Sequence, residues 1–269
     1  MHLNPPVVLV FAGNDPTGGA GLQADAQALV SMGCHPAPVV TAVTAQDTSG
    51  LKAFEAVDAA LVVAQARAVL DDIPVAAFKV GMVGSLANLE AIAAILARHP
   101  KIPCIVDPVL TTDRGDNLTE SPLEDAMRDL LCPRATLLTP NSVEARRLVP
   151  EADSLEACAQ GLLSAGARYV LISGTHEPTP DVIHLLYGEH RLLERYVYGR
   201  LPGRYHGSGC TLAAACAAAF AQGLDSVNAV VQALDYTYQA LRHAWHLGRG
   251  QAVPDRLFWA RADDSEDPD

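Results

Sequence analysis

The stretch VVLVFAGNDPTGGAGLQAD, residues 7–25, decides the fold class of this 269-residue chain. It opens with a continuous apolar run at residues 7–12, which is typical of a strand buried on both faces of a parallel sheet. A glycine-rich turn follows at residues 13–21, and residues 21–32 have the composition of a helix. A buried strand, a tight turn and a helix in this order begin a βαβ unit.

The same alternation continues outward from this stretch through most of the chain. We expect further strands at residues 37–45, 76–81, 104–109, 136–139 and 169–173, and helices at residues 59–72, 85–98, 122–131, 142–148 and 154–165. Residues 181–187 and 191–198 predict an antiparallel hairpin across a tight turn at residues 188–190. Two long helices are expected to follow, at residues 210–222 and 226–246.

These elements predict the α/β class with a three-layer α/β/α arrangement. Strands that are covered on both faces read as continuous apolar runs, so we expect a mainly parallel central sheet between two layers of helices. The antiparallel hairpin is expected at one edge of that sheet. The chain shows no internal repeat or linker, which predicts a single domain over residues 1–269. Its acidic end, residues 262–269, is expected to be disordered.

Composition and charge argue against several classes of partner. The chain has 19 Lys and Arg residues against 31 Asp and Glu residues, a net charge of −12, whereas nucleic-acid binding requires clustered cations. Its apolar runs stop well short of the ~20 residues of a membrane helix, and no signal peptide is recognised. The six cysteines form no C-x-x-C pair, which favours a reducing cytosol. We therefore expect a cytoplasmic protein that binds neither nucleic acid nor a membrane.

The glycine-rich loop at residues 13–21 matches neither of two familiar phosphate-binding loops. Gly13 and Gly18 have the spacing of a P-loop, but Gly19 stands where that motif requires a lysine. The dinucleotide fingerprint G-x-G-x-x-G is not present either. We interpret the loop as a place where another ligand approaches the backbone closely, and the alternative is a tight turn without a ligand.

A second glycine loop, Gly207-Ser208-Gly209-Cys210, stands directly before the helix-forming run TLAAACAAAFAQG (211–223). Glycines at a helix N-terminus let successive backbone N–H groups point at one spot, where the helix dipole also favours an anion. The loop therefore predicts an anion hole suited to a phosphate in transfer. Cys210 would lie on the first helical turn, where the pKa of a thiol is lowered, and could accept the proton of an attacking hydroxyl. The alternative is that Cys210 is a buried helix residue without a chemical role.

The two glycine loops, AGNDPTGGAGLQAD (12–25) and HGSGCTLAAA (206–215), closely resemble those of the hydroxymethylpyrimidine and phosphomethylpyrimidine kinases, a branch of the ribokinase superfamily. The resemblance extends over about residues 7–247, because four further motifs follow in the family's order and spacing. These motifs are TAVTAQDTSG (41–50), KVGMVGS (79–85), DPV (107–109) and TPNSVEARRL (139–148). Most ribokinase-like enzymes carry an Asp as the base after the second loop, whereas this branch carries a Cys, which matches Cys210.

The resemblance implies a ribokinase-like fold and a kinase of thiamine biosynthesis. The implied reaction is the ATP-dependent phosphorylation of 4-amino-5-hydroxymethyl-2-methylpyrimidine and then of its monophosphate to the diphosphate. ATP and Mg²⁺ are the implied co-substrate and metal, and a homodimer is the implied assembly. The aminopyrimidine substrate and ATP are thus the expected small-molecule partners.

The resemblance also assigns roles to individual residues. The catalytic set is Gly207, Ser208, Gly209 and Cys210, and the aminopyrimidine is expected to contact Gly13, Asp25, Gln46, Met82 and Val109. ATP and its phosphates are expected at Asn141, Glu144, Ser173, Thr175 and Arg114, and Mg²⁺ at Asp107 and Glu144.

The chemistry of these residue types suits the implied ligands. The carboxamide of Gln46 offers an acceptor and donors, so it can pair with a ring nitrogen and the adjacent amino group together. Mg²⁺ usually takes only one or two carboxylates besides phosphates and water, so a sparse set of ligands is expected. The alternative for Asn141 and Glu144 is a helix N-terminal cap, and both roles can hold at once.

The chain departs from the family's pattern where phosphate is handled. Residues 173–176 read Ser-Gly-Thr-His instead of Lys-Gly-Gly-His, so the family's lysine is missing. Arg114 is a candidate to supply the positive charge, and Arg200 and Arg204 could also approach phosphates. These changes concern the second phosphorylation more than the first. Two alternatives stay open: a pyridoxal or pyridoxamine kinase of the same superfamily, and a pyrimidine-binding homologue without turnover.

Overall fold

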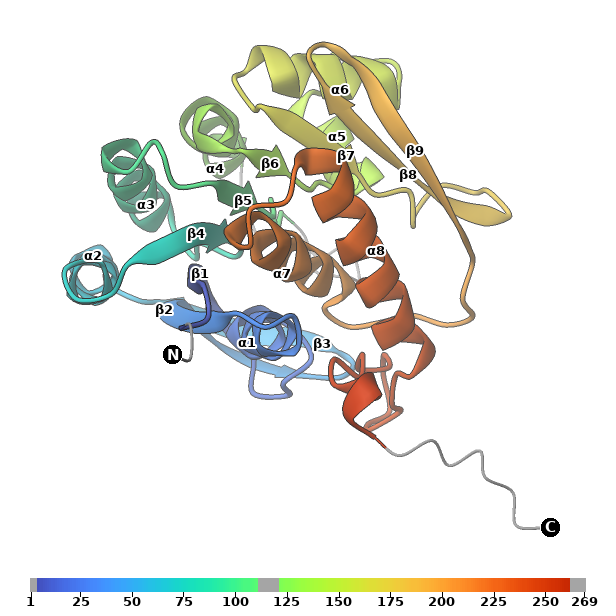
Figure 1. Cartoon of the computed structure of the whole chain (residues 1–269), viewed down its shortest axis with the longest axis horizontal. Coiled ribbons are helices and arrows are strands. Elements are labelled where there is room, and N and C mark those ends of the chain that lie inside the picture. Colours follow the sequence, from blue (N-terminus) through green and yellow to red (C-terminus); the bar gives the residue numbers. More distant parts are fainter. Residues whose placement is uncertain (1–3, 111–120, 262–269) are drawn as a thin grey trace.

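A nine-stranded sheet forms the middle of the protein in a computed structural model, which describes residues 4–110 and 121–261 (Figure 1). In chain order the strands are β1 (Val7–Asn14), β2 (His35–Asp47), β3 (Gly50–Ala56), β4 (Val75–Val80), β5 (Cys104–Val106), β6 (Leu137–Leu138), β7 (Tyr169–Ile172), β8 (Asp181–Gly188) and β9 (Arg191–Gly199). Across the sheet they run in the order β3-β2-β1-β4-β5-β6-β7-β8-β9. The six neighbouring strands β2, β1, β4, β5, β6 and β7 pair in parallel, as the apolar runs predicted.

Both edges of the sheet are antiparallel, whereas the sequence predicted only one such edge. The predicted hairpin of β8 and β9 is confirmed, and β8 also pairs antiparallel with β7. At the opposite edge β3 pairs antiparallel with the end of β2, and this strand was not predicted. Its sequence, GLKAFEA, lies mostly exposed and therefore lacks the apolar run by which the inner strands are recognised.

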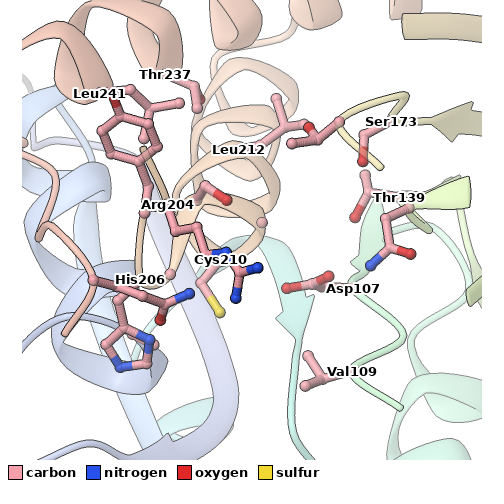
Figure 2. A pocket seen from close by; sticks show the side chains of 18 of the residues that line it. Asp107, Val109, Thr139, Ser173, Arg204, His206, Cys210, Leu212, Thr237 and Leu241 are labelled. Carbon is pink, nitrogen blue, oxygen red and sulfur yellow. The ribbon is translucent and has the colours of Figure 1, made fainter. Parts of the chain in front are cut away.

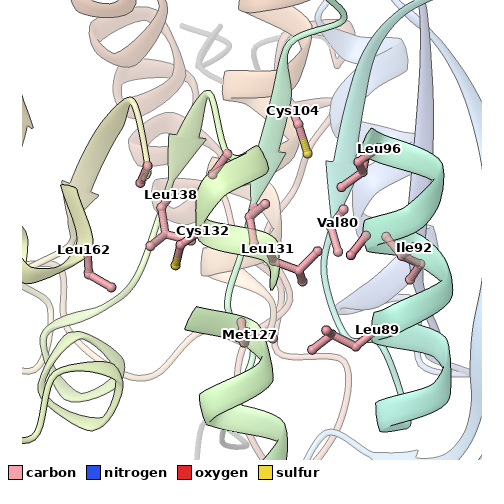
Figure 3. Packing of buried hydrophobic residues seen from close by; sticks show 14 of the residues in the cluster. Val80, Leu89, Ile92, Leu96, Cys104, Met127, Leu131, Cys132, Leu138 and Leu162 are labelled. Atoms are coloured by element: carbon pink, nitrogen blue, oxygen red, sulfur yellow. The ribbon is translucent and has the colours of Figure 1, made fainter. Parts of the chain in front are cut away.

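Helices cover both faces of the sheet and complete the three predicted layers (Figure 1). One face carries α1 (Gly21–Ser31), α7 (Ser208–Ala221) and α8 (Ser226–Arg242), whose apolar residues form one core with the sheet. The other face carries α2 (Ala59–Leu70), α3 (Leu86–Arg98), α4 (Ser121–Ala126), α5 (Ser142–Leu148) and α6 (Leu155–Ser164). Figure 3 shows part of this second core, in which Leu89 and Ile92 of α3 face Val80 of β4.

Helix α7 is the most deeply placed helix and brings the second glycine loop to the sheet. Its residues from Thr211 to Ala219 are all buried, and most of them are alanine. Alanine stabilises a helix and lets neighbouring backbones approach closely, so α7 fits between the sheet, α1 and α8. This packing holds the N-terminus of α7 in place beside the carboxyl ends of the strands.

The chain folds back after α8, which ends at Arg242 and not at the predicted residue 246. The predicted end was wrong because Trp245 leaves the helix and pairs with Val253 in a short antiparallel bridge. Ala252 forms a second bridge with Tyr205, next to the second glycine loop. Among the described residues, no helix has the length and apolar character needed to cross a membrane.

Candidate active site

A cavity of about 1080 Å³ opens at the carboxyl ends of the parallel strands, where ligands bind in open α/β sheets. Its wall takes residues from the loops after β1, β4, β5, β6 and β7 and from the first turn of α7. Figure 2 shows Cys210 on one side of this cavity, with Asp107 and Val109 across from it. Both predicted glycine loops thus contribute to one site.

The first glycine loop is held in shape by Asp15, which the sequence analysis did not single out. Asp15 Oδ1 accepts a hydrogen bond from the backbone N–H of Thr17 at 2.8 Å, and Oδ2 accepts one from the N–H of Ala20 at 2.8 Å. Oδ2 also lies 2.8 Å from His206 Nε2 in the segment before α7. Burial alone would raise the pKa of Asp15, but the bonds from His206 and Thr17 lower it below its ordinary value. The Asp15–His206 contact therefore ties the two glycine loops together.

Gly207 provides the close approach between the two loops. It caps α7 in the left-handed region with φ 75°, which favours glycine. A Cβ atom at this position would lie 2.1 Å from the backbone oxygen of Gly19, so a side chain cannot fit without movement of the first loop. At Gly209 a Cβ would lie 3.9 Å from Asp107 Oδ1, which shows that the start of α7 faces this carboxylate closely. Gly207, Ser208, Gly209 and Cys210 all line the cavity.

The pKa of the Cys210 thiol is raised, whereas the sequence predicted a lowered pKa. A helix N-terminus was expected to lower its pKa, but burial is the largest effect and raises the pKa far above the ordinary range. The positive charge of Lys79 acts in the opposite direction without reversing the result. The prediction was wrong because loss of water around a thiolate outweighs the attraction of one buried cation and the helix N-terminus. At neutral pH the group is therefore a thiol.

Asp25 lies beneath the cavity and pairs with Lys79. The structure therefore does not support the predicted contact between Asp25 and the aminopyrimidine. Both side chains are fully buried, and Lys79 Nζ lies 2.9 Å from Asp25 Oδ2. Asp25 is not among the residues that line the cavity, whereas Lys79 is. Lys79 Nζ also lies 4.0 Å from Asp107 Oδ2, so one buried cation stands between two carboxylates. Burial alone would lower the pKa of Lys79, but Asp25 first and other buried acidic groups raise it.

The other residues expected to contact the aminopyrimidine all line the cavity, namely Gly13, Gln46, Met82 and Val109. Met82 packs closely on the first loop, since a Cβ on Gly13 would lie 3.2 Å from the Met82 sulfur. Gln46 stands near the end of β2 at the junction with β3. The structure places all four residues at the cavity wall, and their contact with a ligand stays a prediction.

Asn141 and Glu144 form the helix cap that was considered as an alternative to a ligand role. Asn141 Oδ1 accepts hydrogen bonds from the N–H groups of Val143 and Glu144, each at 2.9 Å. Glu144 Oε2 in turn accepts from the N–H of Asn141 at 2.9 Å, which completes a capping box. Both residues also line the cavity, as do Ser173 and Thr175. The predicted phosphate residue Arg114 lies outside the described residues.

Arg200 has a structural partner, although it was considered for phosphate binding. Its guanidinium donates to three backbone oxygens of the loop after β7, those of Thr175 at 2.8 Å, Glu177 at 2.9 Å and Thr179 at 3.1 Å. The side chain therefore holds this loop against the segment that follows β9. The loop carries Thr175, so Arg200 shapes the cavity wall indirectly.

Arg256 joins the end of the fold to both glycine loops and was missed in the sequence analysis. It is 1% exposed, and its Nε donates to Thr211 Oγ1 in α7 at 2.9 Å. The two terminal nitrogens donate to the backbone oxygens of Gly18, at 3.3 Å, and Gly19. No motif marks this arginine. Lys79, in contrast, could have been recognised from the sequence, because it is the only charged residue in the apolar strand VAAFKV.

The sequence comparisons find phosphomethylpyrimidine kinases, and the structural comparison finds one of these and also pyridoxal kinases. A family model described as phosphomethylpyrimidine kinase matches residues 15–255. The chain is 40% identical over 262 residues to the hydroxymethylpyrimidine/phosphomethylpyrimidine kinase of Mycobacterium bovis, with 95% of each chain covered. Its structure is similar to that of a phosphomethylpyrimidine kinase from Clostridium difficile, with a TM-score of 0.76 and 30% identity over 88% of this chain and 99% of that chain. It is also similar to a Bacillus subtilis pyridoxal kinase in an ADP complex, with a TM-score of 0.86 and 25% identity over 96% of this chain and 99% of that chain.

Proposed function

Because this chain belongs to the phosphomethylpyrimidine kinase family, we propose that it phosphorylates 4-amino-5-hydroxymethyl-2-methylpyrimidine with ATP and then converts the monophosphate to the diphosphate for thiamine biosynthesis. The observation that carries the proposal is the second glycine loop. Gly207 holds the N-terminus of α7 at the cavity, with Cys210 on the first turn and Asp107 opposite. Backbone N–H groups at such a helix start favour a phosphoryl group in transfer.

The aminopyrimidine is proposed to bind on the side of the cavity formed by Gln46, Met82 and Val109. The carboxamide of Gln46 can pair with a ring nitrogen and the neighbouring amino group, and Met82 can pack against the ring. Asp25 lies beneath this wall and pairs with Lys79, which lines the cavity. The hydroxymethyl group would then point toward Cys210.

Phosphoryl transfer relies mostly on positioning and on neutralisation of charge. The hydroxymethyl oxygen forms a bond to the γ-phosphorus while the bond from that phosphorus to the ADP oxygen breaks. The hydroxyl proton passes to the Cys210 sulfur in the ionised fraction of the enzyme. Burial raises the pKa of Cys210, so this fraction is small at neutral pH and increases in alkaline solution.

The donor groups at the strand ends fit Mg²⁺. Asp107 is 5% exposed and lines the cavity together with Glu144, so two carboxylates face the cavity. This suits an ion that takes one or two carboxylates and completes its coordination with phosphates and water. We propose that Asp107 and Glu144 hold Mg²⁺, which would neutralise phosphate charge when bound.

ATP is proposed to lie between the start of α7 and the loop after β7, in contact with Asn141, Ser173 and Thr175. We also propose that the chain acts as a single kinase unit, because one sheet takes strands from residue 7 to residue 199. A homodimer is proposed from the family resemblance. A cytoplasmic location is supported by the cysteines, which are all free thiols.

Product analysis tests the proposed reaction against its nearest alternative. The purified chain is incubated with ATP and Mg²⁺ and either hydroxymethylpyrimidine or pyridoxal, and the products are resolved by mass. Pyrimidine monophosphate and diphosphate are expected, with Cys210→Ala strongly reduced in both. Pyridoxal phosphate as the main product would instead assign the chain to pyridoxal phosphorylation. If ligands raise the melting temperature but no ADP forms, the chain is a binding protein without turnover.

A further inference from the structure

The cavity wall contains four cationic side chains among the described lysine and arginine residues, and three of them already have partners. Lys79 pairs with the buried carboxylate of Asp25 at 2.9 Å. Arg147 pairs with Glu124 through a short ion pair. The guanidinium of Arg200 donates to three backbone oxygens of the loop after β7. These three charges therefore hold the protein together and are not available to a phosphate without a loss elsewhere.

Arg204 is the fourth cation, and its guanidinium forms no ion pair or hydrogen bond with the residues that the structure describes. Figure 2 shows its side chain pointing into the cavity on the side of Cys210. The side chain is exposed to solvent, so a ligand can reach it without displacing a protein partner.

The backbone around Arg204 is fixed on both sides, although its side chain has no partner among the described residues. The oxygen of Arg204 accepts a hydrogen bond from Ala252 N–H at 3.0 Å, and His206 N–H donates to the Ala252 oxygen at 2.9 Å. His206 is anchored in turn by Asp15 at 2.8 Å. Gly207, which caps α7, follows directly. The guanidinium is therefore attached three residues before the proposed transfer point, on a backbone that is already in place.

The second phosphorylation makes a demand on this region that the first does not. The first acceptor is an uncharged alcohol, whereas the second is a phosphate ester that must approach the γ-phosphate of ATP. Asp107 adds a further carboxylate across from Cys210. A cation between these groups offsets their repulsion, and the fork of an arginine can bind two phosphate oxygens together.

We propose that Arg204 binds the phosphate of the phosphomethylpyrimidine acceptor and is the residue that makes the second phosphorylation efficient. This inference rests on the proposed function and deepens it, because it separates the two reactions of one site by one side chain.

The test compares Arg204→Gln with Arg249→Gln, a matched loss of one exposed arginine that does not line the cavity. The kcat/KM values are measured separately for hydroxymethylpyrimidine and for phosphomethylpyrimidine as the starting substrate. Loss of a charge-assisted hydrogen bond predicts a roughly 10- to 150-fold decrease for phosphomethylpyrimidine in Arg204→Gln. Less than about a threefold change is expected for hydroxymethylpyrimidine, because it has no phosphate for the guanidinium to bind. Arg204→Lys keeps the charge without the fork and is expected to retain part of the second activity.

Calorimetric binding of the two pyrimidines without ATP gives a readout that does not depend on turnover. The expected result is weaker binding of phosphomethylpyrimidine, and unchanged binding of hydroxymethylpyrimidine, in Arg204→Gln alone. Equal losses for both pyrimidines, or no loss for either, would overturn the role of Arg204 while leaving the proposed function intact. A wild-type chain that binds both pyrimidines but phosphorylates neither contradicts the proposed function and with it the catalytic part of the Arg204 proposal, and the binding comparison then still decides whether Arg204 binds the acceptor phosphate. Failure of the wild type to bind either pyrimidine overturns both.

Discussion

Acidification is expected to destabilise this protein through His184, a cavity residue on β8. His184 is 8% exposed, its ring packs edge-on against Tyr198 at 5.8 Å between centroids, and its buried Nδ1 has no hydrogen-bond partner among the described residues. Burial disfavours the charged ring and lowers its pKa from 6.5 to about 4. Each unit of difference between folded and unfolded states corresponds to about 1.4 kcal/mol, so the shift is equivalent to about 3 kcal/mol.

The sign follows from which state binds the proton. Between pH 6.5 and 4 the unfolded chain holds a proton on this histidine and the folded chain does not, so stability increases with pH over this range. The contribution is fully present above pH 6.5 and is lost as the pH falls through the folded-state value of about 4.

Urea denaturation of the wild type and of His184→Phe at pH 7 and pH 4 measures this contribution directly. Phenylalanine keeps the ring contact with Tyr198 but cannot be protonated, and all other titrating groups cancel in the difference between the two proteins. The free energy of unfolding of the wild type relative to the variant should fall by about 3 kcal/mol on acidification. A difference that stays constant with pH would refute the reasoning and would mean that His184 is protonated in the folded state.

Three further changes test other parts of the site. Gly207→Ala should lower the free energy of unfolding by more than the ~1–2 kcal/mol of left-handed strain, because its Cβ meets the first loop, and should abolish most activity. Gly223→Ala has similar strain but open space, so urea denaturation and kinase assays should show only the smaller stability loss. Lys79→Met leaves the Asp25 carboxylate buried without its partner and should cost ~3–5 kcal/mol in urea denaturation, whereas adding Asp25→Asn should restore much of this. If the single and double variants are equally stable, the pair does not act as described. The wild-type rate should rise with pH through the alkaline range because burial raises the pKa of Cys210, and Cys210→Asp should remove this rise. A pH-independent wild-type rate would argue against proton transfer to the thiol.

The sequence predicts the parallel part of the fold well, because strands buried on both faces have long apolar runs. It fails at β3, whose exposed residues follow no apolar pattern. Both glycine loops could be located, since a left-handed turn before a helix requires glycine and a helix-forming run marks the helix. The pattern cannot show that the two loops touch each other at Gly19 and Gly207.

The errors at Asp25 and Cys210 have a common physical origin. The role of Asp25 came from the family resemblance and the acidity of Cys210 from its place at a helix start, but the behaviour of each depends on burial and on charges distant in sequence. Asp25 meets a lysine 54 residues away, and Cys210 lies half-buried at the cavity wall, where loss of water raises the pKa of its thiol. Local patterns contain neither the depth of a side chain nor its long-range partners.

The contact between Arg256 and the first glycine loop also has a consequence for biosynthesis. The arginine is translated 238 residues after Gly18, yet it donates hydrogen bonds to that glycine and its neighbour and to Thr211 of α7. A nascent chain on the ribosome can therefore form most of the sheet long before the loops acquire this support. The two loops are thus fully braced only after residue 256 has emerged from the ribosome and docked.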